Sequence, residues 1–411
     1  IMRDQFGYNY ALKDKLFETK DRDRFQRIIV KAAANDNYPE SNGGAHIRDQ
    51  YVHHLSQLAD LRMDERSYQS CIVYLNGDYW GVYDLREKVD DHDFTDYYYD
   101  QDKNNLQFLK TWGGTWSEYG GAQSQTDWDN LKNYIISNPM NIQANYNTVK
   151  SQYNTGSLID YFLLNSYVVC SDWLNWNTAW WRGMDPNGDK KKWRYVLWDM
   201  DATFDHYINY TGVPSTSPTA DPCDPSSLND PGGQGHVPVW NALLNNDDFF
   251  NDYLNRWQDL ANGHLSCNSM VNLLDSMIAI IEPEMPRHIQ LWGGNYAQWQ
   301  GNVQDLRNFI LARCDSMNTG FVPCYPTLLS GPYNVTVEII GIGEVEMSDD
   351  NIINEINTPW TDQRFGGVIL PFEVKSGTFQ NWEIIPAGVY VYDPLVDTLE
   401  LDLQADVSII A

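Results

Sequence analysis

Apolar and polar residues alternate along the first hundred positions in a way that predicts a small sheet with one helix. Residues 25–31 form a strand-like run, and residues 70–76 and 79–85 form two more. An Asn-Gly pair separates the last two runs, which is the strongest short-range signal for a β-hairpin. Residues 46–60 place apolar side chains on one helical face, so a helix is predicted between the first strand and the hairpin.

The middle of the chain shows mainly the hydrophobic periodicity that is typical of helices. Residues 127–170 are predicted to be helical, and their last part is apolar nearly all round, which indicates a buried helix. A second hairpin is predicted over residues 178–198. Residues 211–236 are rich in Pro, Ser, Gly and Asp and are expected to form a long loop, and helices return over residues 238–318.

The pattern changes again near the C-terminal end, where short alternating strands such as 335–340, 366–374 and 389–392 follow one another. We therefore predict an α+β chain in three parts. An N-terminal lobe covers residues 1–100, a mainly helical lobe covers 101–325, and a small all-β module covers 331–411.

The charge of the chain limits its partners. It contains 56 acidic and 28 basic residues, with a formal net charge of −28. The resulting negative electrostatic potential disfavours binding to nucleic acid and to anionic membranes, and it favours basic partners. The alternative is that the acidic surface serves only solubility. No apolar run approaches the ~20 residues of a membrane span. The chain begins at Ile1 without a charged and apolar leader, so we expect a mature or trimmed form, and removal of a signal peptide is left open.

Six cysteines are present, and none forms a C-x-x-C pair, so a zinc site is not indicated. Cys71 and Cys170 lie in apolar runs and are interpreted as buried thiols. The other four are candidates for two disulfides in an oxidising compartment, with the pairing left open: Cys223, Cys267, Cys314 and Cys324.

Two acidic clusters carry the clearest chemistry. Asp172 stands five residues before Asn177, and Asp199 and Asp201 follow an apolar strand. Phosphoryl transfer needs a carboxylate that orients the attacking hydroxyl and oxygen ligands that hold Mg²⁺ against the phosphates. In this interpretation Asp172 is the base, Asn177 a neutral metal ligand and Asp199 an anionic one. Asp201 is a further metal ligand or a cap of the following turn.

Cations that would offset phosphate charge are sought in the N-terminal lobe. Lys31 ends a strand and Arg48 begins the following helix, and both are candidates for binding the nucleotide. An ion pair from the strand to the helix would require an acid in the helix, and only Asp49 and Asp60 are available there. The alternative for Lys31 is a solvated charge at the end of a strand.

Two further residues are candidates for nucleotide contact. Glu87 follows the hairpin, where a hinge would join two lobes, and the alternative is a pair with Arg86 or Lys88. Trp193 precedes Asp199 by six residues, an even spacing that puts both on one face of a strand. Trp193 is therefore a candidate to stack on adenine, or else an ordinary core aromatic.

Other catalytic classes find little support. The chain has no G-x-S-x-G, no H-E-x-x-H and no Walker G-x-x-x-x-G-K-[ST] motif. Paired carboxylates and many Trp suggest a glycosidase, but both clusters are rich in Asp interleaved with Asn.

These residues together resemble the CotH kinase family, atypical protein kinases related in fold to kinases of the secretory pathway. The specific elements are the Asn-Gly-x-Tyr-Trp-Gly-x-Tyr run over residues 76–83 and the Trp-Asp-x-Asp run over residues 198–201, and the likeness extends roughly over residues 20–320. It implies a bilobal kinase-like fold with Asp172 as the catalytic residue and Asp199 as the metal ligand. The chain lacks the Gly-rich loop, H-R-D and D-F-G motifs of typical kinases, as the family does. The residues that bind the phosphates are therefore not defined by these motifs.

The resemblance also implies an activity. We expect ATP- and Mg²⁺- or Mn²⁺-dependent transfer of the γ-phosphate to Ser or Thr of a protein acceptor that is basic or rich in Ser and Thr, by a secreted or surface-exposed bacterial protein. The segment after Pro332 is similar to β repeat modules of bacterial surface proteins. The alternatives are an inactive pseudokinase that serves as a surface or adhesion protein, and a carbohydrate-binding protein. The oligomeric state is left open.

Overall fold

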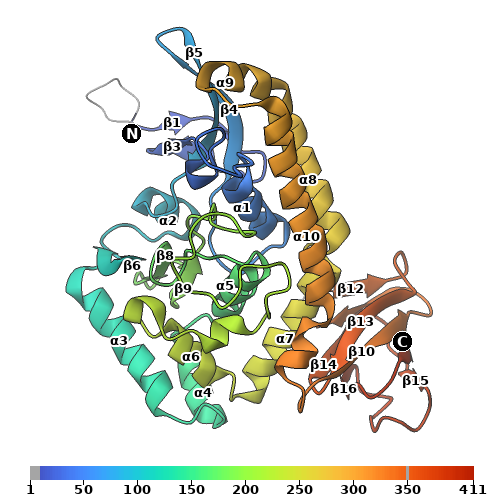
Figure 1. Cartoon of the computed structure of the whole chain (residues 1–411). Helices are drawn as coiled ribbons and strands as arrows, with labels where there is room; N and C mark the ends of the chain where they lie inside the picture. The colour runs from blue at the N-terminus through green and yellow to red at the C-terminus, as the bar shows by residue number, and fades with distance from the viewer. Residues whose placement is uncertain (1–9, 349–350) are drawn as a thin grey trace.

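The computed structural model describes residues 10–348 and 351–411. Its N-terminal part contains a three-stranded antiparallel sheet in the order β3-β5-β4, with helix α1 beside it (Figure 1). The bounds are β3 Ile28–Lys31, α1 Arg48–Leu58, β4 Tyr68–Leu75 and β5 Asp78–Glu87. The predicted helix and hairpin are confirmed, and the predicted first strand is divided between β2 (Arg24–Phe25) and β3. A short strand, β1 (Leu12–Lys13), pairs with β2.

The turn of the hairpin shows why the Asn-Gly pair was informative. Asn76 and Gly77 both have positive φ, 53° and 93°, which suits the backbone twist of a two-residue hairpin. Asn tolerates this region better than most residues, and Gly carries no Cβ that would oppose it.

A second sheet lies in the middle of the chain, in the order β7-β6-β8-β9. Its bounds are β6 Leu106–Trp112, β7 Gly114–Tyr119, β8 Thr178–Gly183 and β9 Arg194–Val196. The hairpin of β8 and β9 is confirmed, whereas β6 and β7 were not predicted. Helix α5 (Thr155–Tyr167) is buried on all sides, as its continuous apolar character indicated.

The remaining helices surround these sheets, and α8 and α10 run together from the N-terminal sheet to the C-terminal region (Figure 1). Their bounds are α2 His92–Tyr99, α3 Gly121–Ser137, α4 Gln143–Lys150, α6 His236–Leu243, α7 Asp247–Asn262, α8 Cys267–Ile281, α9 Met285–Trp292 and α10 Tyr296–Cys324. Among the described residues, no helix combines the length and the apolar character needed to cross a bilayer.

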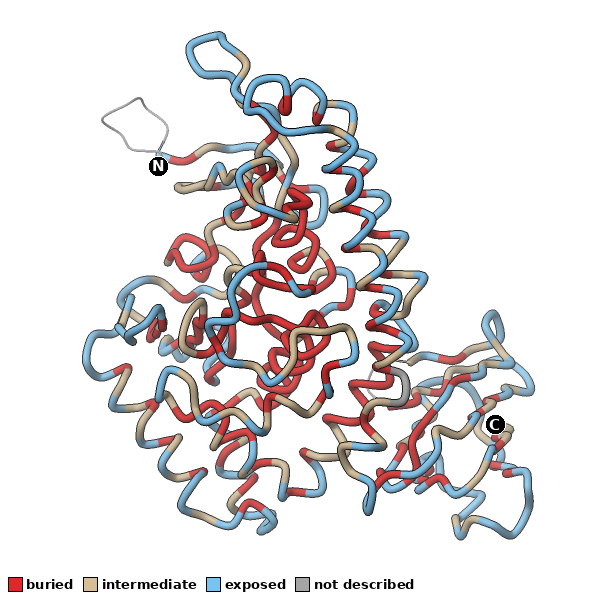
Figure 2. Tube along the Cα trace, viewed as in Figure 1, coloured by how far each residue is buried: buried red, intermediate tan, exposed pale blue. Residues whose placement is uncertain are grey.

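One continuous hydrophobic core joins the N-terminal part to the helical part (Figure 2). It includes Tyr51 and Leu55 of α1, Leu164 of α5, and Trp257 and Phe321 of the C-terminal helices. The two predicted lobes are therefore packed against each other through a common interior. This shared interior holds the polar groups between them at defined positions.

The C-terminal region is all β and consists of two four-stranded sheets with a core of their own. The sheet orders are β13-β10-β17-β15 and β12-β11-β14-β16. The bounds are β10 Ser330–Glu338, β11 Gly343–Met347, β12 Asn351–Asn354, β13 Trp360–Gly366, β14 Ile369–Gly377, β15 Glu383–Ile385, β16 Thr398–Asp402 and β17 Val407–Ile410. The strand predicted at residues 389–392 does not form, and that segment lies in an open connection.

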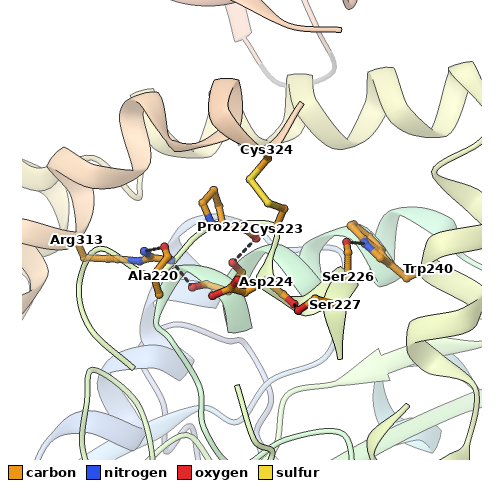
Figure 3. The surroundings of a disulfide bond; sticks show 10 residues. Ala220, Pro222, Cys223, Asp224, Ser226, Ser227, Trp240, Arg313 and Cys324 are labelled. Atoms are coloured by element: carbon orange, nitrogen blue, oxygen red, sulfur yellow. Dashed lines mark hydrogen bonds between the residues drawn. A yellow bond between two sulfur atoms is a disulfide. The ribbon is translucent and has the colours of Figure 1, made fainter. Parts of the chain in front are cut away.

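Both disulfides join segments far apart in the chain. Cys223 pairs with Cys324 and Cys267 with Cys314, while Cys170 is a buried free thiol and Cys71 a half-buried one. Figure 3 shows the first bond, which ties the long loop over residues 211–236 to the end of α10.

Arg313 of α10 reinforces the same attachment. Its buried guanidinium donates to the backbone oxygens of Tyr167 at 3.0 Å, Pro218 at 3.1 Å and Ser166 at 2.8 Å. These bonds connect α10 both to the end of α5 and to the long loop, which passes beside the first acidic cluster.

Candidate active site

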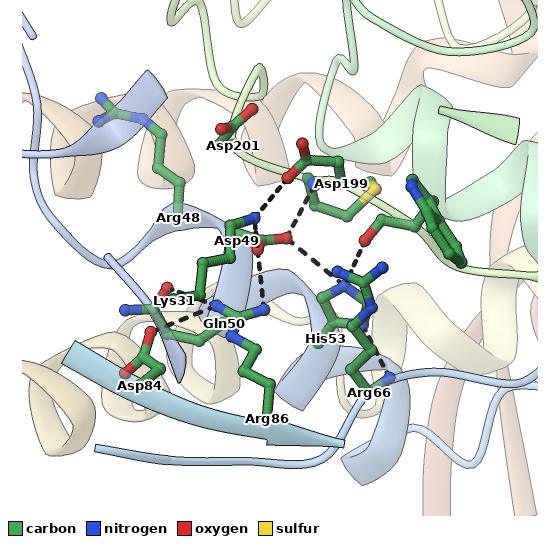
Figure 4. Close-up of polar contacts among 12 residues, drawn as sticks. Lys31, Arg48, Asp49, Gln50, His53, Arg66, Asp84, Arg86, Asp199 and Asp201 are labelled. Atoms are coloured by element: carbon green, nitrogen blue, oxygen red, sulfur yellow. Dashed lines mark hydrogen bonds and ion pairs between the residues drawn. The ribbon is translucent and has the colours of Figure 1, made fainter. Parts of the chain in front are cut away.

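Lys31 occupies the centre of the polar network between the two lobes (Figure 4). Its Nζ lies 2.5 Å from Oδ2 of Asp49 in α1 and 2.6 Å from Oδ1 of Asp199. The strand, the helix and the second acidic cluster are thus joined by one ammonium group. The alternative of a solvated charge at a strand end is excluded, because the side chain is largely buried between two carboxylates.

Asp49 anchors this network. It is fully buried, and besides Lys31 it contacts Arg86 of β5 at 2.8 Å and accepts the backbone N–H of Met200 at 2.8 Å. Burial alone would raise the pKa of Asp49, but the charges of Arg86 and Lys31 outweigh it and hold the pKa well below its ordinary value. The carboxylate is therefore ionised throughout the physiological range and fixes Lys31 in place.

A second layer of contacts positions the segment after β9 that carries Asp199. His53 Nε2 donates to the carbonyl oxygen of Trp198 at 2.7 Å, and His53 Nδ1 accepts the N–H of Arg66 at 3.1 Å. The guanidinium of Arg66 lies 4.3 Å from the centre of the Trp198 ring. Burial lowers the pKa of His53, so the ring is neutral and acts as a fixed donor and acceptor.

Asp172 and Asn177 face each other across the first acidic cluster. Asn177 Nδ2 donates to Oδ2 of Asp172 at 2.9 Å. Burial, and then the charge of Asp199, raise the pKa of Asp172 to about 6. A carboxylate with this pKa is ionised at neutral pH and can still exchange a proton, which is the property that a general base requires.

The two acidic clusters are held side by side by the backbone. The N–H of Ser171 donates to the carbonyl oxygen of Ala202 at 3.0 Å, next to Asp201. Asp201 is fully buried, and its Oδ2 accepts the N–H of Asn35 at 2.8 Å. Burial, followed by the charge of Asp199, raises the pKa of Asp201 to about 8, so it binds its proton near neutral pH unless a cation is present.

The donor set suits a hard divalent cation. It consists of carboxylates and one carboxamide, the ligands that Mg²⁺ and Mn²⁺ use in proteins. Oδ1 of Asp172 and Oδ1 of Asp201 are buried and have no hydrogen-bond partner among the described residues. Buried oxygens of this kind are costly unless a ligand satisfies them, so both fit a role as metal ligands.

The carboxylates of the two acidic clusters do not converge on a single position where a metal ion would bind. Within residues 10–348 and 351–411, the only three His, Cys, Asp or Glu ligand atoms within 4.8 Å of one another belong to Cys267, Cys314 and Asp315. Two of these are sulfurs joined in a disulfide, so that group does not hold a metal. Asp199 is instead paired with Lys31, and its side chain is 27% exposed, which leaves it reachable from solvent.

Three predicted nucleotide contacts are not brought to this site. Arg48 is buried and its guanidinium binds Asp36, and it points away from Asp199 in Figure 4. Glu87 is fully buried and its ion pair is with Arg22 at 2.8 Å, so its carboxylate faces the interior and is paired with neither Arg86 nor Lys88.

The prediction that Trp193 stacks on adenine is wrong. Its ring is 0% exposed and packs against Trp128 at 5.6 Å between ring centres, with Arg182 over its face. The strand β9 spans only Arg194–Val196, so the chain leaves the strand before it reaches Asp199 and the even spacing does not carry over. Trp193 is a core aromatic, the alternative that the sequence had left open.

Sequence reasoning missed Arg86, Arg66 and His53 as members of the site, and it used Trp198 only as part of the Trp-Asp-x-Asp run that contains Asp199. The first three contribute through partners distant in the chain.

Comparison with known proteins gives a family match. Residues 5–317 match the family described as CotH kinase protein. Among solved structures, the chain is similar to one from the complex of the Shewanella oneidensis MR-1 toxin–antitoxin system HipA, HipB and its operator DNA, with a TM-score of 0.30 and 11% identity. The similarity covers 73% of this chain and 62% of that one, so the chain spans less than two thirds of that relative. No functional conclusion follows from a likeness of this size. No curated protein matches the chain.

Proposed function

Because the chain belongs to the CotH kinase protein family, we propose that it is a protein kinase that uses ATP and Mg²⁺ or Mn²⁺ to phosphorylate Ser or Thr hydroxyls. The observation that carries the proposal is the placement of Lys31 between Asp49 of the helix and Asp199, beside the pair of Asp172 and Asn177. A lysine on a strand, paired with an acid on the adjacent helix, is the arrangement by which kinases align the phosphates.

Each residue has a role in this proposal. Asp172 orients the acceptor hydroxyl and takes its proton, and its pKa of about 6 suits that exchange near neutral pH. Lys31 offsets phosphate charge, and Asp49 fixes its position. Asp199, Asn177 and Asp201 would hold the divalent cation, which neutralises charge on the phosphates when bound.

The proposal also covers the type of acceptor protein and the cellular location of the kinase. The acidic field, with a net charge of −28, favours a basic acceptor protein. The pairing of Cys223 with Cys324 and of Cys267 with Cys314 supports an oxidising compartment, and hence a secreted or surface-exposed protein.

The test is transfer of labelled γ-phosphate to a mixture of proteins in the presence of Mg²⁺ or Mn²⁺. Replacing Asp172 with Asn removes the base at nearly constant shape and should slow transfer by about 10²–10⁴-fold. Asp397→Asn, at an exposed position in the β region, is the matched control and should leave the rate unchanged.

A thermal shift distinguishes the inactive alternatives. ATP with metal should raise the melting temperature of the wild-type protein, and Asp199→Asn should abolish the rise. No shift at millimolar ATP with either metal would contradict the proposal and favour a non-catalytic surface protein.

A further inference from the structure

Four aromatic rings, three of them exposed and one half-buried, form a corner beside the first acidic cluster. Trp176 lies between Asp172 and Asn177 in sequence, and its ring centre is 5.2 Å from that of Trp112 and 6.0 Å from that of Tyr210. Tyr207 continues the series at 6.0 Å from Tyr210. We call these four residues the aromatic corner.

The geometry of the aromatic corner is that of a partial cage and not of a flat platform. Adjacent rings meet at 78° for Trp112 and Trp176, at 59° for Trp176 and Tyr210, and at 56° for Tyr210 and Tyr207. Sugars stack on a ring that offers a free flat face, whereas steeply inclined rings can surround a compact cation with several faces at once. The angles therefore favour a cationic ligand.

Three of the four rings of the aromatic corner are exposed, and Trp176 is half-buried. Trp112 is 65% exposed, and Tyr207 and Tyr210 are each 44% exposed. Isolated exposed aromatics are ordinary, but a contiguous set at the edge of a site is typical of a surface that binds a ligand.

The backbone holds the aromatic corner against the acidic cluster. The N–H of Gly113 donates to the carbonyl oxygen of Asn175 at 2.9 Å, and Asn175 Nδ2 donates to the carbonyl oxygen of Tyr210 at 2.9 Å. Gly113 has φ of +71°, and a Cβ there would lie 2.8 Å from the Trp176 ring. Three separate segments are thus fixed at one place, and the close approach requires glycine.

The charges of these segments are complementary to a cation. Residues 111–119, 171–177 and 199–211 contain no Lys or Arg, and their ionisable acids are Glu118, Asp172, Asp199, Asp201 and Asp205. Asp199 is paired with Lys31, and Asp201 binds its proton near neutral pH, so Asp172 and Asp205 supply the attraction. Lys110, just before the first segment, is already paired with Asp90 at 2.8 Å and Glu118 at 3.1 Å.

Tyr207 connects the aromatic corner to the acidic cluster. Burial, the adjacent Tyr210, and the charges of Asp201 and Asp172 together raise the pKa of Tyr207. Trp176 of the corner stands between Asp172 and Asn177 in sequence, so a group held by the corner would lie beside the first acidic cluster.

We propose that the aromatic corner binds a Lys or Arg side chain that flanks the hydroxyl to be phosphorylated, and so selects the acceptor sequence. The identification as an acceptor site rests on the proposed kinase function, whereas binding of the cationic side chain does not. The rings would surround the alkyl and cationic parts of the side chain, and the acids would supply long-range attraction.

The test measures binding of three fluorescent peptides without nucleotide. All contain a central Ser and are identical except for its neighbours, which are Arg, norleucine or Glu. The variants are Trp112→Ala and Tyr210→Ala, which change no charge. Trp292→Ala, an exposed Trp on α9 outside the aromatic corner, and Tyr210→Phe, which keeps the ring, are the controls.

The wild-type protein should prefer the Arg peptide, and Trp112→Ala and Tyr210→Ala should weaken its binding by about 3- to 30-fold. Binding of the norleucine peptide should change less, and both controls should bind as the wild type does. Equal binding of the Arg peptide by all variants would show that charge alone attracts it and would overturn the proposal. So would loss of binding to a chitin oligosaccharide in the same two variants with no loss for the Arg peptide, because a glycan would then be the ligand.

Phosphoryl transfer to the same peptides separates this inference from the proposed function. Peptide binding that depends on the rings, with neither transfer nor an ATP-induced thermal shift, would refute the kinase function and leave the cation site standing. Transfer to the Arg peptide that is unaffected by the two ring variants would refute the role of the corner in selecting the acceptor and leave the kinase function standing.

Discussion

The raised pKa of Asp172 makes a prediction about stability that does not depend on substrate. Burial and the charge of Asp199 raise this pKa from 3.8 to about 6. Between these values the folded protein binds more protons than the unfolded chain, so stability falls as the pH rises through the window. Above about pH 6, the charged form of Asp172 destabilises the folded state.

The magnitude follows from the size of this change. Raising the pKa from 3.8 to about 6 corresponds to about 3 kcal/mol. Relaxation of the protein and water penetration around the ionised carboxylate reduce the figure to about 1–2 kcal/mol. Asp172→Asn removes the charge and keeps an oxygen that can accept the hydrogen bond of Asn177. The variant should therefore be more stable than the wild type at pH 8 by about 1–2 kcal/mol, with much lower activity.

The assay is the thermal midpoint of both proteins from pH 5 to pH 8, without nucleotide or metal. The sequence pI of about 4.4 sets the lower limit, because solubility falls near it. A gain of about 2–4 °C for each kcal/mol is expected at pH 8, and it should shrink to about half at pH 5. Other groups that titrate in this range are common to both proteins and cancel in the difference.

The reasoning would be refuted by a variant that is no more stable than the wild type at pH 8, or by a gain that is independent of pH. Asp397→Asn, in the exposed part of the β region, should show no difference from the wild type at either end of the range.

Further predictions concern the network and the covalent cross-links. Asp201→Asn should also raise the melting temperature near pH 8, since the pKa of about 8 means that ionisation opposes folding as the pH rises toward that value, and differential scanning fluorimetry across pH would show it. Asp49→Ala leaves buried cations without a counter-charge and should cost about 3–5 kcal/mol in the free energy of unfolding; a loss below 1 kcal/mol in denaturant titration would contradict the central role of this residue. Lys31→Met should abolish the ATP-induced thermal shift while the nucleotide-free protein remains folded by circular dichroism. Replacing Cys223 and Cys324 with Ser should cost about 2–5 kcal/mol, and an unchanged midpoint in non-reducing buffer would show that the bond does not stabilise the loop.

Much of the architecture could be predicted because its signals are local. The hairpin of β4 and β5 follows from an Asn-Gly pair between apolar runs, and the buried helix α5 follows from a continuous apolar surface. The strands β6 and β7 were missed because residues 106–119 mix Lys, Thr, Gly and Trp without a clear period. Whether such a segment becomes a strand depends on the partner against which it pairs, here β8.

The sequence by itself determined which residues are candidates for the chemistry: Asp172 and Asn177 lie five positions apart, and Asp199 follows an apolar run. Only the tertiary structure decided their partners. Lys31 meets Asp199 across 168 positions, and Trp193 is enclosed in the core although the spacing allowed an open face. The physical reason is that periodicity defines one element at a time, whereas the pairing of a buried charge or the exposure of a ring depends on which elements pack together.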